Sequence, residues 1–70
     1  EAIEFRIFED SKVTNTPLMH LPLKKNLLVS FICRNGSILI PSGQDCIQVG
    51  DSVMIVTTHT GFKDILDILQ

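Results

Sequence analysis

A single β-hairpin signal places the strongest constraint on how this sequence folds. Residues 27–33 read Leu-Leu-Val-Ser-Phe-Ile-Cys, and the sequence Arg34-Asn35-Gly36-Ser37 follows at once. Asn-Gly between two apolar runs is the strongest short-range indication of a tight turn between strands. The returning strand is predicted over 37–41, and Pro41 marks its end or a sheet edge because proline has no amide hydrogen to donate. We expect the strand at 27–33 to be the centre of the sheet, buried on both faces.

Two further strands are predicted on either side of this hairpin. Residues 3–8 alternate apolar and charged side chains, which is the period of a strand with one solvated face. Residues 53–58 read Val-Met-Ile-Val-Thr-Thr and predict a strand that is covered on both faces. Turns are expected at 42–45 and 50–51, where Gly and Asp gather.

Two helices complete the predicted architecture. Thr16-Pro17 has the pattern of an N-cap and first helical residue, and Pro22 ends this short helix. Thr60 is predicted to cap a final helix over 61–70. Its apolar stripe comprises Phe62, Ile65, Leu66 and Leu69. The resulting order, β-α-β-β-β-α, predicts the α+β class with a small, mainly antiparallel sheet.

The length of the chain restricts it to a single domain over residues 1–70. A chain of this size buries only about 60% of the surface that its unfolded form exposes. Hydrophobic residues nevertheless make up 44% of it and charged residues only 20%, against roughly 25% charged in an average domain. We expect a second copy to cover the surplus apolar surface in a twofold dimer. Because the sequence begins with Glu1 rather than Met, we also expect it to be a fragment of a longer chain.

Composition argues against several classes of function. The net charge is −2 and the cations are scattered apart from Lys24-Lys25, so no basic stripe for nucleic acid is predicted. No segment approaches the ~20 apolar residues of a membrane helix, so no membrane insertion is expected. Cys33 and Cys46 are too few for a disulfide framework or a zinc site, and we expect reduced thiols in a reducing cytosol.

No catalytic constellation can be assembled from the sequence, so the chain is predicted not to be an enzyme. His20 and His59 lack partners at metal-ligand spacing, and no nucleophile elbow or phosphate-binding glycine loop is present. Asp51, Asp64 and Asp67 are interpreted as solvated acids. Three cations, Lys24, Lys25 and Arg34, lie near the ends of the strand at 27–33, where they could hold an anionic ligand such as a nucleotide. The alternative is that the two lysines form a solvated connector.

An ordered set of short motifs points to a known family. Residues 38–43 read Ile-Leu-Ile-Pro-Ser-Gly, Asp45 follows, and residues 50–53 read Gly-Asp-Ser-Val before the last apolar strand. Together with the predicted first strand and the segment 16–36, this order resembles the RCK_C (TrkA-C) domain, the C-terminal half of units that regulate potassium conductance. The resemblance covers nearly the whole chain, and it is strongest to the versions found in Trk-type potassium-uptake proteins.

The resemblance implies a location, partners and a ligand. Members of the family are cytoplasmic, lie at the inner face of the plasma membrane against a membrane-embedded potassium transporter subunit, and form homodimers through this domain. The companion RCK_N domain, absent here, binds NAD(H) or ATP, so no dinucleotide cofactor is expected in this fragment. Some members bind cyclic di-AMP between two C domains. Carried onto this sequence, the cleft would involve Leu23, Lys24, Lys25, Leu28, Val29, Ile40 and Pro41.

The expected function is therefore regulatory ligand binding and dimerisation in a Trk- or Ktr-type system that transports K⁺. Two alternatives stay open at this stage. The domain could belong to another cation or anion transporter, because RCK_C modules also occur in antiporters, permeases and channels. It could also be a pure dimerisation module that binds no small ligand.

Overall fold

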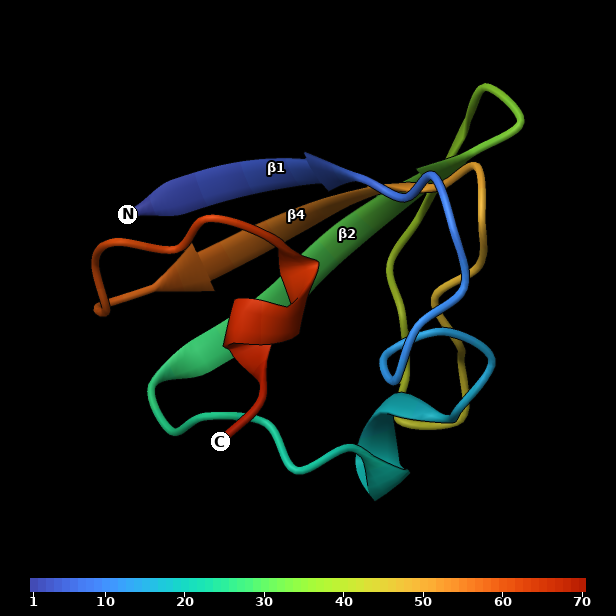
Figure 1. Ribbon diagram of the computed structural model, residues 1–70. Coiled ribbons are helices and arrows are strands. Elements are labelled where there is room, and N and C mark those ends of the chain that lie inside the picture. The colour runs from blue at the N-terminus through green and yellow to red at the C-terminus, as the bar shows by residue number, and fades with distance from the viewer.

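The computed structural model describes all residues, 1–70, and its framework is a four-stranded antiparallel sheet (Figure 1). The elements along the chain are β1 (Ala2–Arg6), η1 (Leu18–His20), β2 (Leu27–Arg34), β3 (Ser37–Leu39), β4 (Ser52–Thr57) and η2 (Ile65–Ile68). The order across the sheet is β1-β4-β2-β3, so β2 and β4 are central and β1 and β3 are the edges. The predicted antiparallel sheet is confirmed.

The hairpin between β2 and β3 forms at the Asn-Gly turn, as the sequence predicts. Asn35 and Gly36 both have positive φ, 52° and 79°, as the tight turn of a two-residue hairpin requires. Arg34 pairs with Ser37 and Ile32 with Leu39, which sets the register. The strand β3 ends at Leu39, two residues before Pro41.

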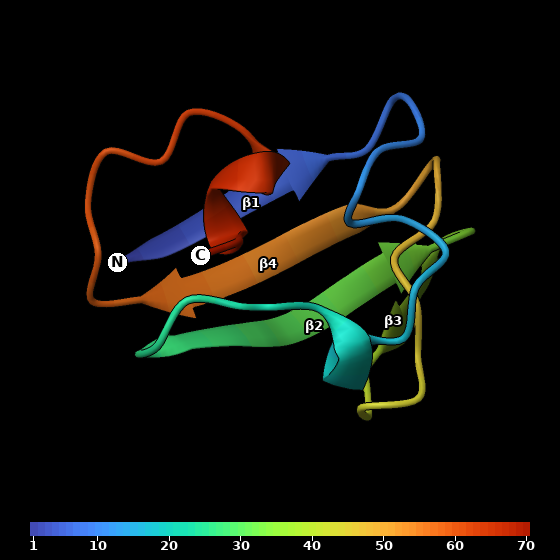
Figure 2. The ribbon, with the colours of Figure 1, turned by 60° about the horizontal axis from the view of Figure 1, so that its bottom comes forward.

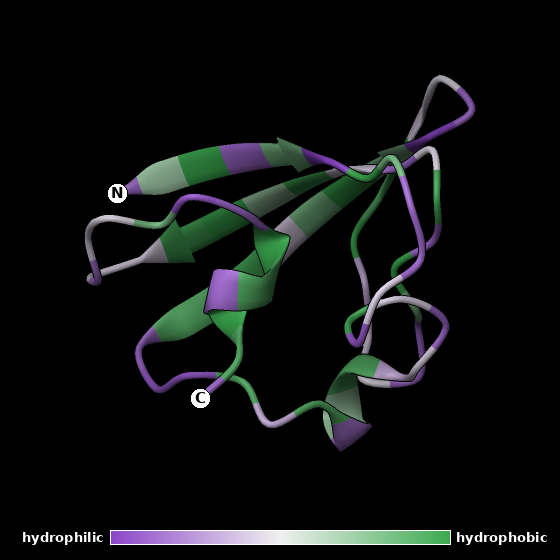
Figure 3. Ribbon diagram, viewed as in Figure 1, coloured by the Kyte–Doolittle hydropathy of each residue, from purple (hydrophilic) through white to green (hydrophobic).

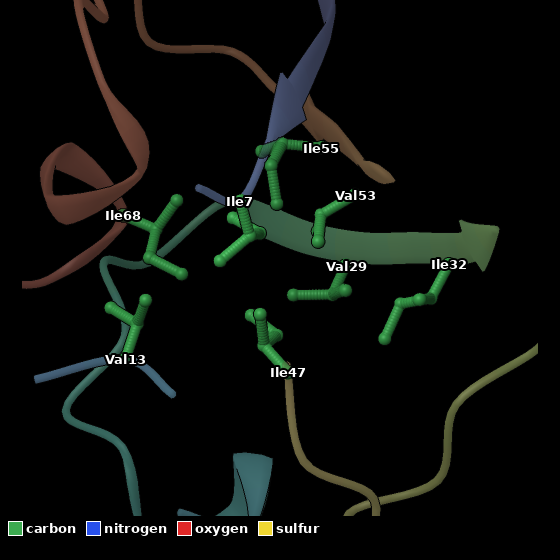
Figure 4. Packing of buried hydrophobic residues seen from close by; sticks show 8 residues of the cluster. All are labelled: Ile7, Val13, Val29, Ile32, Ile47, Val53, Ile55 and Ile68. Atoms are coloured by element: carbon green, nitrogen blue, oxygen red, sulfur yellow. The ribbon is translucent and has the colours of Figure 1, made fainter. Parts of the chain in front are cut away.

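All covering segments lie on one side of the sheet. Figure 2 shows η1 over β2 and β3, and η2 over β1 and β4, on the same side. The eight buried apolar side chains meet between this side and the loops: Ile7, Val13, Val29, Ile32, Ile47, Val53, Ile55 and Ile68 (Figure 4). These side chains come from strands and loops alike, so loop residues complete the core that the small sheet begins.

The other face of the sheet is uncovered, which corrects the expectation that two strands are buried on both faces. Cross-strand partners share a face, and the pairs Leu28–Val56 and Phe31–Met54 lie opposite the core pairs such as Val29–Ile55. Leu28 is 62% exposed and Val56 is 42% exposed. The prediction fails because a continuous apolar run shows only that both faces of a strand carry apolar side chains. Whether both faces are buried depends on how many other segments are available to cover them.

The predicted final helix over 61–70 is also wrong. The segment contains only the 3₁₀ turn η2, and its N-cap is Asp64 rather than Thr60. The side chain of Asp64 accepts from the amide of Leu66, and that of Asp67 accepts from the amides of Lys63 and Asp64. The two bonds that Asp67 accepts lower its pKa. Both acids are bonded to backbone amides at the start of η2, so they are capping groups rather than merely solvated ones. The first helix is likewise a 3₁₀ turn, with Pro17 at its N-cap instead of Thr16.

Candidate functional site

An apolar groove of about 260 Å³ lies where the edge of β2 is left open. Because β3 ends opposite Ile32, the beginning of β2 has no neighbour on that side. The groove is lined by the start of β2, by η1 and the segment after it, and by the turn that follows β3. Its lining residues are Leu18, Met19, Leu23, Leu27, Leu28, Val29, Pro41, Ser42 and Gly43.

The groove also has polar backbone groups along one wall. The amide of Thr58 donates to the carbonyl of Asn26, so the even-numbered residues at the start of β2 are the ones whose backbone groups form hydrogen bonds with β4. In an antiparallel pair the alternate residues point their N–H and C=O groups away from the partner strand. The backbone groups of Leu27 and Val29 therefore face the groove side of β2, where β3 does not reach. An apolar cleft with a few fixed donors and acceptors is the usual form of a small-ligand site.

Four of the seven residues predicted to line a ligand cleft meet at this groove: Leu23, Leu28, Val29 and Pro41. Lys24, Lys25 and Ile40 are not among its lining residues. Ile40 follows β3 and is 73% exposed. Sequence reasoning missed five lining residues: Leu18 and Met19 of η1, of which Met19 is 63% exposed, Leu27 at the start of β2, and Ser42 and Gly43 of the turn after β3. That these residues bind a ligand stays a prediction.

Lys24 holds the C-terminal segment in place. Its Nζ donates to the carbonyl of Leu69 at 2.9 Å and to the carbonyl of Asp67, and it lies 5.2 Å from the ring centroid of Phe62. The backbone around it is tied to the same segment, because the amide of Lys24 donates to the carbonyl of Ile68. Lys25, in contrast, is exposed, and its side chain makes no hydrogen bond within the chain. The two adjacent lysines therefore differ, and only Lys25 keeps an unengaged ammonium group.

Arg34, the third predicted anion-binding cation, already has a partner in the chain. Its Nε and Nη2 donate to the two carboxylate oxygens of Asp51, each at 2.9 Å, and Nη2 also donates to the carbonyl of Cys46. Asp51 is 1% exposed, so the interpretation of Asp51 as a solvated acid is wrong. This bidentate pair joins the end of β2 to the start of β4 and leaves little of Arg34 for a ligand.

The environment of Asp51 determines its ionisation. Burial raises the pKa of this carboxyl, but the hydrogen bonds from Arg34 and from the amide of Gln48 outweigh burial and hold the pKa below its usual value. The same bond raises the pKa of Arg34. The pair is therefore ionised in the folded protein, and the chain leaves no buried side-chain nitrogen or oxygen without a hydrogen bond.

The groove opens beside the uncovered face of the sheet, since Leu28 belongs to both. The open face carries the apolar side chains that share a register with Leu28, from all four strands. They are Ala2, Leu28, Phe31, Cys33, Ile38, Met54 and Val56. Figure 3 shows the hydrophobic residues continuing along β2 and β4.

Cys33 and Cys46 are both free thiols. No three His, Cys, Asp or Glu side chains gather as a metal site would require.

The fold is that of an RCK domain. A solved structure described as "Structure of RCK domain with cda" superposes with a TM-score of 0.67 at 24% identity, covering 94% of this chain and 87% of that one. The family model of the TrkA-C domain matches residues 2–70. The chain therefore belongs to the TrkA-C family, and the resemblance inferred from its motifs is confirmed.

Curated relatives carry the same family name. The chain is 39% identical over 57 residues to the Trk system potassium uptake protein TrkA homolog of Archaeoglobus fulgidus, covering 81% of this chain and 13% of that protein. It is 30% identical over 71 residues to the homolog from Pyrococcus abyssi, covering 100% of this chain and 31% of that protein. The chain thus spans less than a third of either relative. It is a TrkA-C domain like those of proteins named for potassium uptake. Neither of its helices has the length and hydropathy to cross a bilayer.

Proposed function

We propose that this domain is a non-catalytic regulatory module of a Trk- or Ktr-type potassium-uptake system, which forms a homodimer and binds a small anionic effector such as cyclic di-AMP. The observation that carries the proposal is the apolar groove beside an uncovered sheet face. A dimer formed through that face would bring two grooves close to the twofold axis, because Leu28 belongs to both surfaces.

The mechanism follows from this placement. A ligand that fills the grooves and fits one relative orientation of the two copies better than another shifts the dimer toward that orientation. The shift is limited to the difference in affinity, typically about 1–3 kcal/mol. An attached N-terminal domain would pass the movement to a membrane-embedded transporter subunit from the cytoplasmic side of the membrane. Family membership and the names of the curated relatives support this setting.

The groove supplies stacking surface and hydrogen bonds rather than strong charge. Leu23, Leu28 and Pro41 offer apolar contact to a base, and the backbone groups of Leu27 and Val29 offer donors and acceptors. Lys25 is the free cation of the predicted set, because Lys24 and Arg34 are engaged within the chain. The description of the related RCK structure, which includes cda, also supports a ligand on this fold.

Calorimetric titration of cyclic di-AMP into the chain tests ligand binding. Met19→Glu places a carboxylate in the groove at an exposed position and should weaken binding at least about tenfold through like-charge repulsion. Val49→Glu makes the same change at an exposed position outside the groove and should bind like the wild type. No heat and no rise in melting temperature with the wild-type chain would refute the ligand and favour a pure dimerisation module.

Sedimentation tests the dimer separately. Val56→Lys puts a charge on the open face and should weaken association through that face, which lowers the average mass in sedimentation, whereas Val49→Lys, at an exposed position outside the strands, should leave it unchanged. Identical association of wild type and Val56→Lys would show that the open face is not the interface.

A further inference from the structure

The outer edge of β1 is a free strand edge. Glu1 and Thr57 exchange hydrogen bonds in both directions, and the amide of Ile7 donates to the carbonyl of Asp51, so the odd-numbered residues of this strand face β4. The alternation of an antiparallel pair then points the N–H and C=O groups of Ala2, Glu4 and Arg6 away from the sheet. Their backbone groups make no hydrogen bond outside the strand ladder. Figures 1 and 2 both show β1 at the rim of the sheet with no strand beyond it.

A second groove runs alongside this edge. It has a volume of about 390 Å³ and lies between β1 with the residues after it and the segment 63–66. Phe5, Ile65 and Leu66 are among its lining residues, and so is Phe8, which is 83% exposed. An unpaired edge next to exposed aromatic and aliphatic side chains is a template for another strand.

The charges on β1 specify which strand fits. Glu4 and Arg6 project from the open face, two residues apart, and both have outward-facing backbone groups. In an antiparallel pair of two β1 strands, the numbers of any two directly opposed residues add up to the same value, which defines the register. The outward-facing residues are even-numbered, so they can bond to one another only in registers whose sum is even. A sum of 10 places Glu4 opposite the second copy's Arg6 on both sides of the twofold axis. A sum of 8 would place the two Glu4 residues opposite each other, and a sum of 12 would place the two Arg6 residues opposite each other. Like charges in directly opposed positions disfavour both of these registers.

We propose that β1 pairs antiparallel with β1 of a second copy, with the twofold axis between the two Phe5 residues. The two four-stranded sheets then join into one continuous sheet. The contact uses the strand edge, which is distinct from the open face assigned above to the dimer. It therefore goes beyond the proposed function and provides a route to assemblies larger than a dimer.

The groove beside the edge suits this arrangement. In the register that pairs Glu4 with Arg6, the two Phe5 residues form a directly opposed pair without hydrogen bonds, whose side chains approach closely. Phe5 is only partly buried in a single chain and lines the groove. Its counterpart from the second copy would enter the same space, so aromatic contact adds to the backbone bonds.

Charge reversal tests the register. The measurements use the Val56→Lys background, so that association through the open face is removed. Glu4→Arg and Arg6→Glu each replace two attractive pairs by two repulsive ones and should weaken association about tenfold or more. The double variant, Glu4→Arg with Arg6→Glu, should restore it. An equimolar mixture of the two single variants should form a mixed pair, because each copy then meets opposite charges. Lys12→Glu, an exposed charge reversal outside β1 and outside the lining of the second groove, is the control.

Amide hydrogen exchange provides a second readout that needs no edge variant. In the Val56→Lys chain, the amides of Glu4 and Arg6 should become protected as the protein concentration rises, while those of Phe5 and Ile7, already bonded to β4, should not change. Association that is unaffected by both single reversals, or amides that exchange at the same rate at all concentrations, would overturn edge pairing. Either result leaves the open-face dimer standing, because that dimer is tested by Val56→Lys alone.

Discussion

Removing the guanidinium of Arg34 should expose how much the fold depends on one buried ion pair. Arg34→Met keeps a long, flexible apolar side chain but leaves the carboxylate of Asp51, 1% exposed, with only the amide of Gln48 as a donor. Breaking a buried pair by removing one partner costs about 3–5 kcal/mol. The side chain of Arg34 is 28% exposed, so water can partly replace it, and we expect a loss at neutral pH of about 3 kcal/mol.

The pH dependence separates this reasoning from a general packing defect. In the wild type the folded-state pKa of Asp51 lies below its unfolded value, so the stabilisation is present above about pH 4 and is lost as the pH falls through the folded pKa. In Arg34→Met the main lowering cause is gone and burial raises the pKa of Asp51. Its destabilising charge is then neutralised on acidification. The difference in stability between the two proteins should therefore be largest at neutral pH and shrink toward pH 4 and below.

Urea unfolding followed by circular dichroism, at neutral pH and near pH 4, measures both quantities. A loss of about 3 kcal/mol corresponds to a fall in melting temperature of roughly 12–24 °C for a domain of this size. Lys12→Met, which removes an exposed cation, serves as the control and should change stability by less than about 0.5 kcal/mol. If Arg34→Met loses the same free energy at both pH values, the unpaired charge on Asp51 is not the cause and the reasoning is refuted.

Two further predictions concern single positions. Lys24→Met should lower the free energy of unfolding by about 1–2 kcal/mol and speed amide exchange in 65–69, because Lys24 caps the carbonyls of that segment. Lys25→Met should be nearly neutral. Equal effects of the two variants in urea unfolding would contradict the separate roles of the two lysines. Gly36→Ala should lower the free energy of unfolding by about 1 kcal/mol through backbone strain alone, since φ is +79° and an added Cβ meets nothing within 4 Å. Asn35→Gly should change the unfolding midpoint little. A Gly36→Ala variant as stable as the wild type would refute this assignment of strain.

The strands and the hairpin could be predicted because their signals are local. The turn at Asn35-Gly36 depends on two residues that tolerate positive φ, and the alternation in β1 depends on neighbours two apart. The family resemblance also depended on residue order alone, and it survived the errors in the predicted helices. Four of the nine residues that line the candidate groove were named in the same way, from the family resemblance: Leu23, Leu28, Val29 and Pro41.

The C-terminal segment shows where a local pattern is insufficient. The spacing of apolar residues predicts a helix with Leu66 on its buried stripe, yet Leu66 is 42% exposed and Ile68 is fully buried. The backbone of this segment is held by Lys24 and Leu23, which lie more than forty residues before it in the sequence. A short segment with weak helical preference adopts the shape that such tertiary hydrogen bonds satisfy.

The sequence by itself determined the strands, their central turn, the antiparallel class and the family. Only the tertiary structure decided that Arg34 binds Asp51, that the adjacent lysines differ, and that one face of the sheet lies open. The physical reason is the range of the interactions. Turn geometry and side-chain alternation act between near neighbours, whereas an ion pair or an uncovered face depends on which distant segments arrive, and seventy residues supply enough covering segments for only one side.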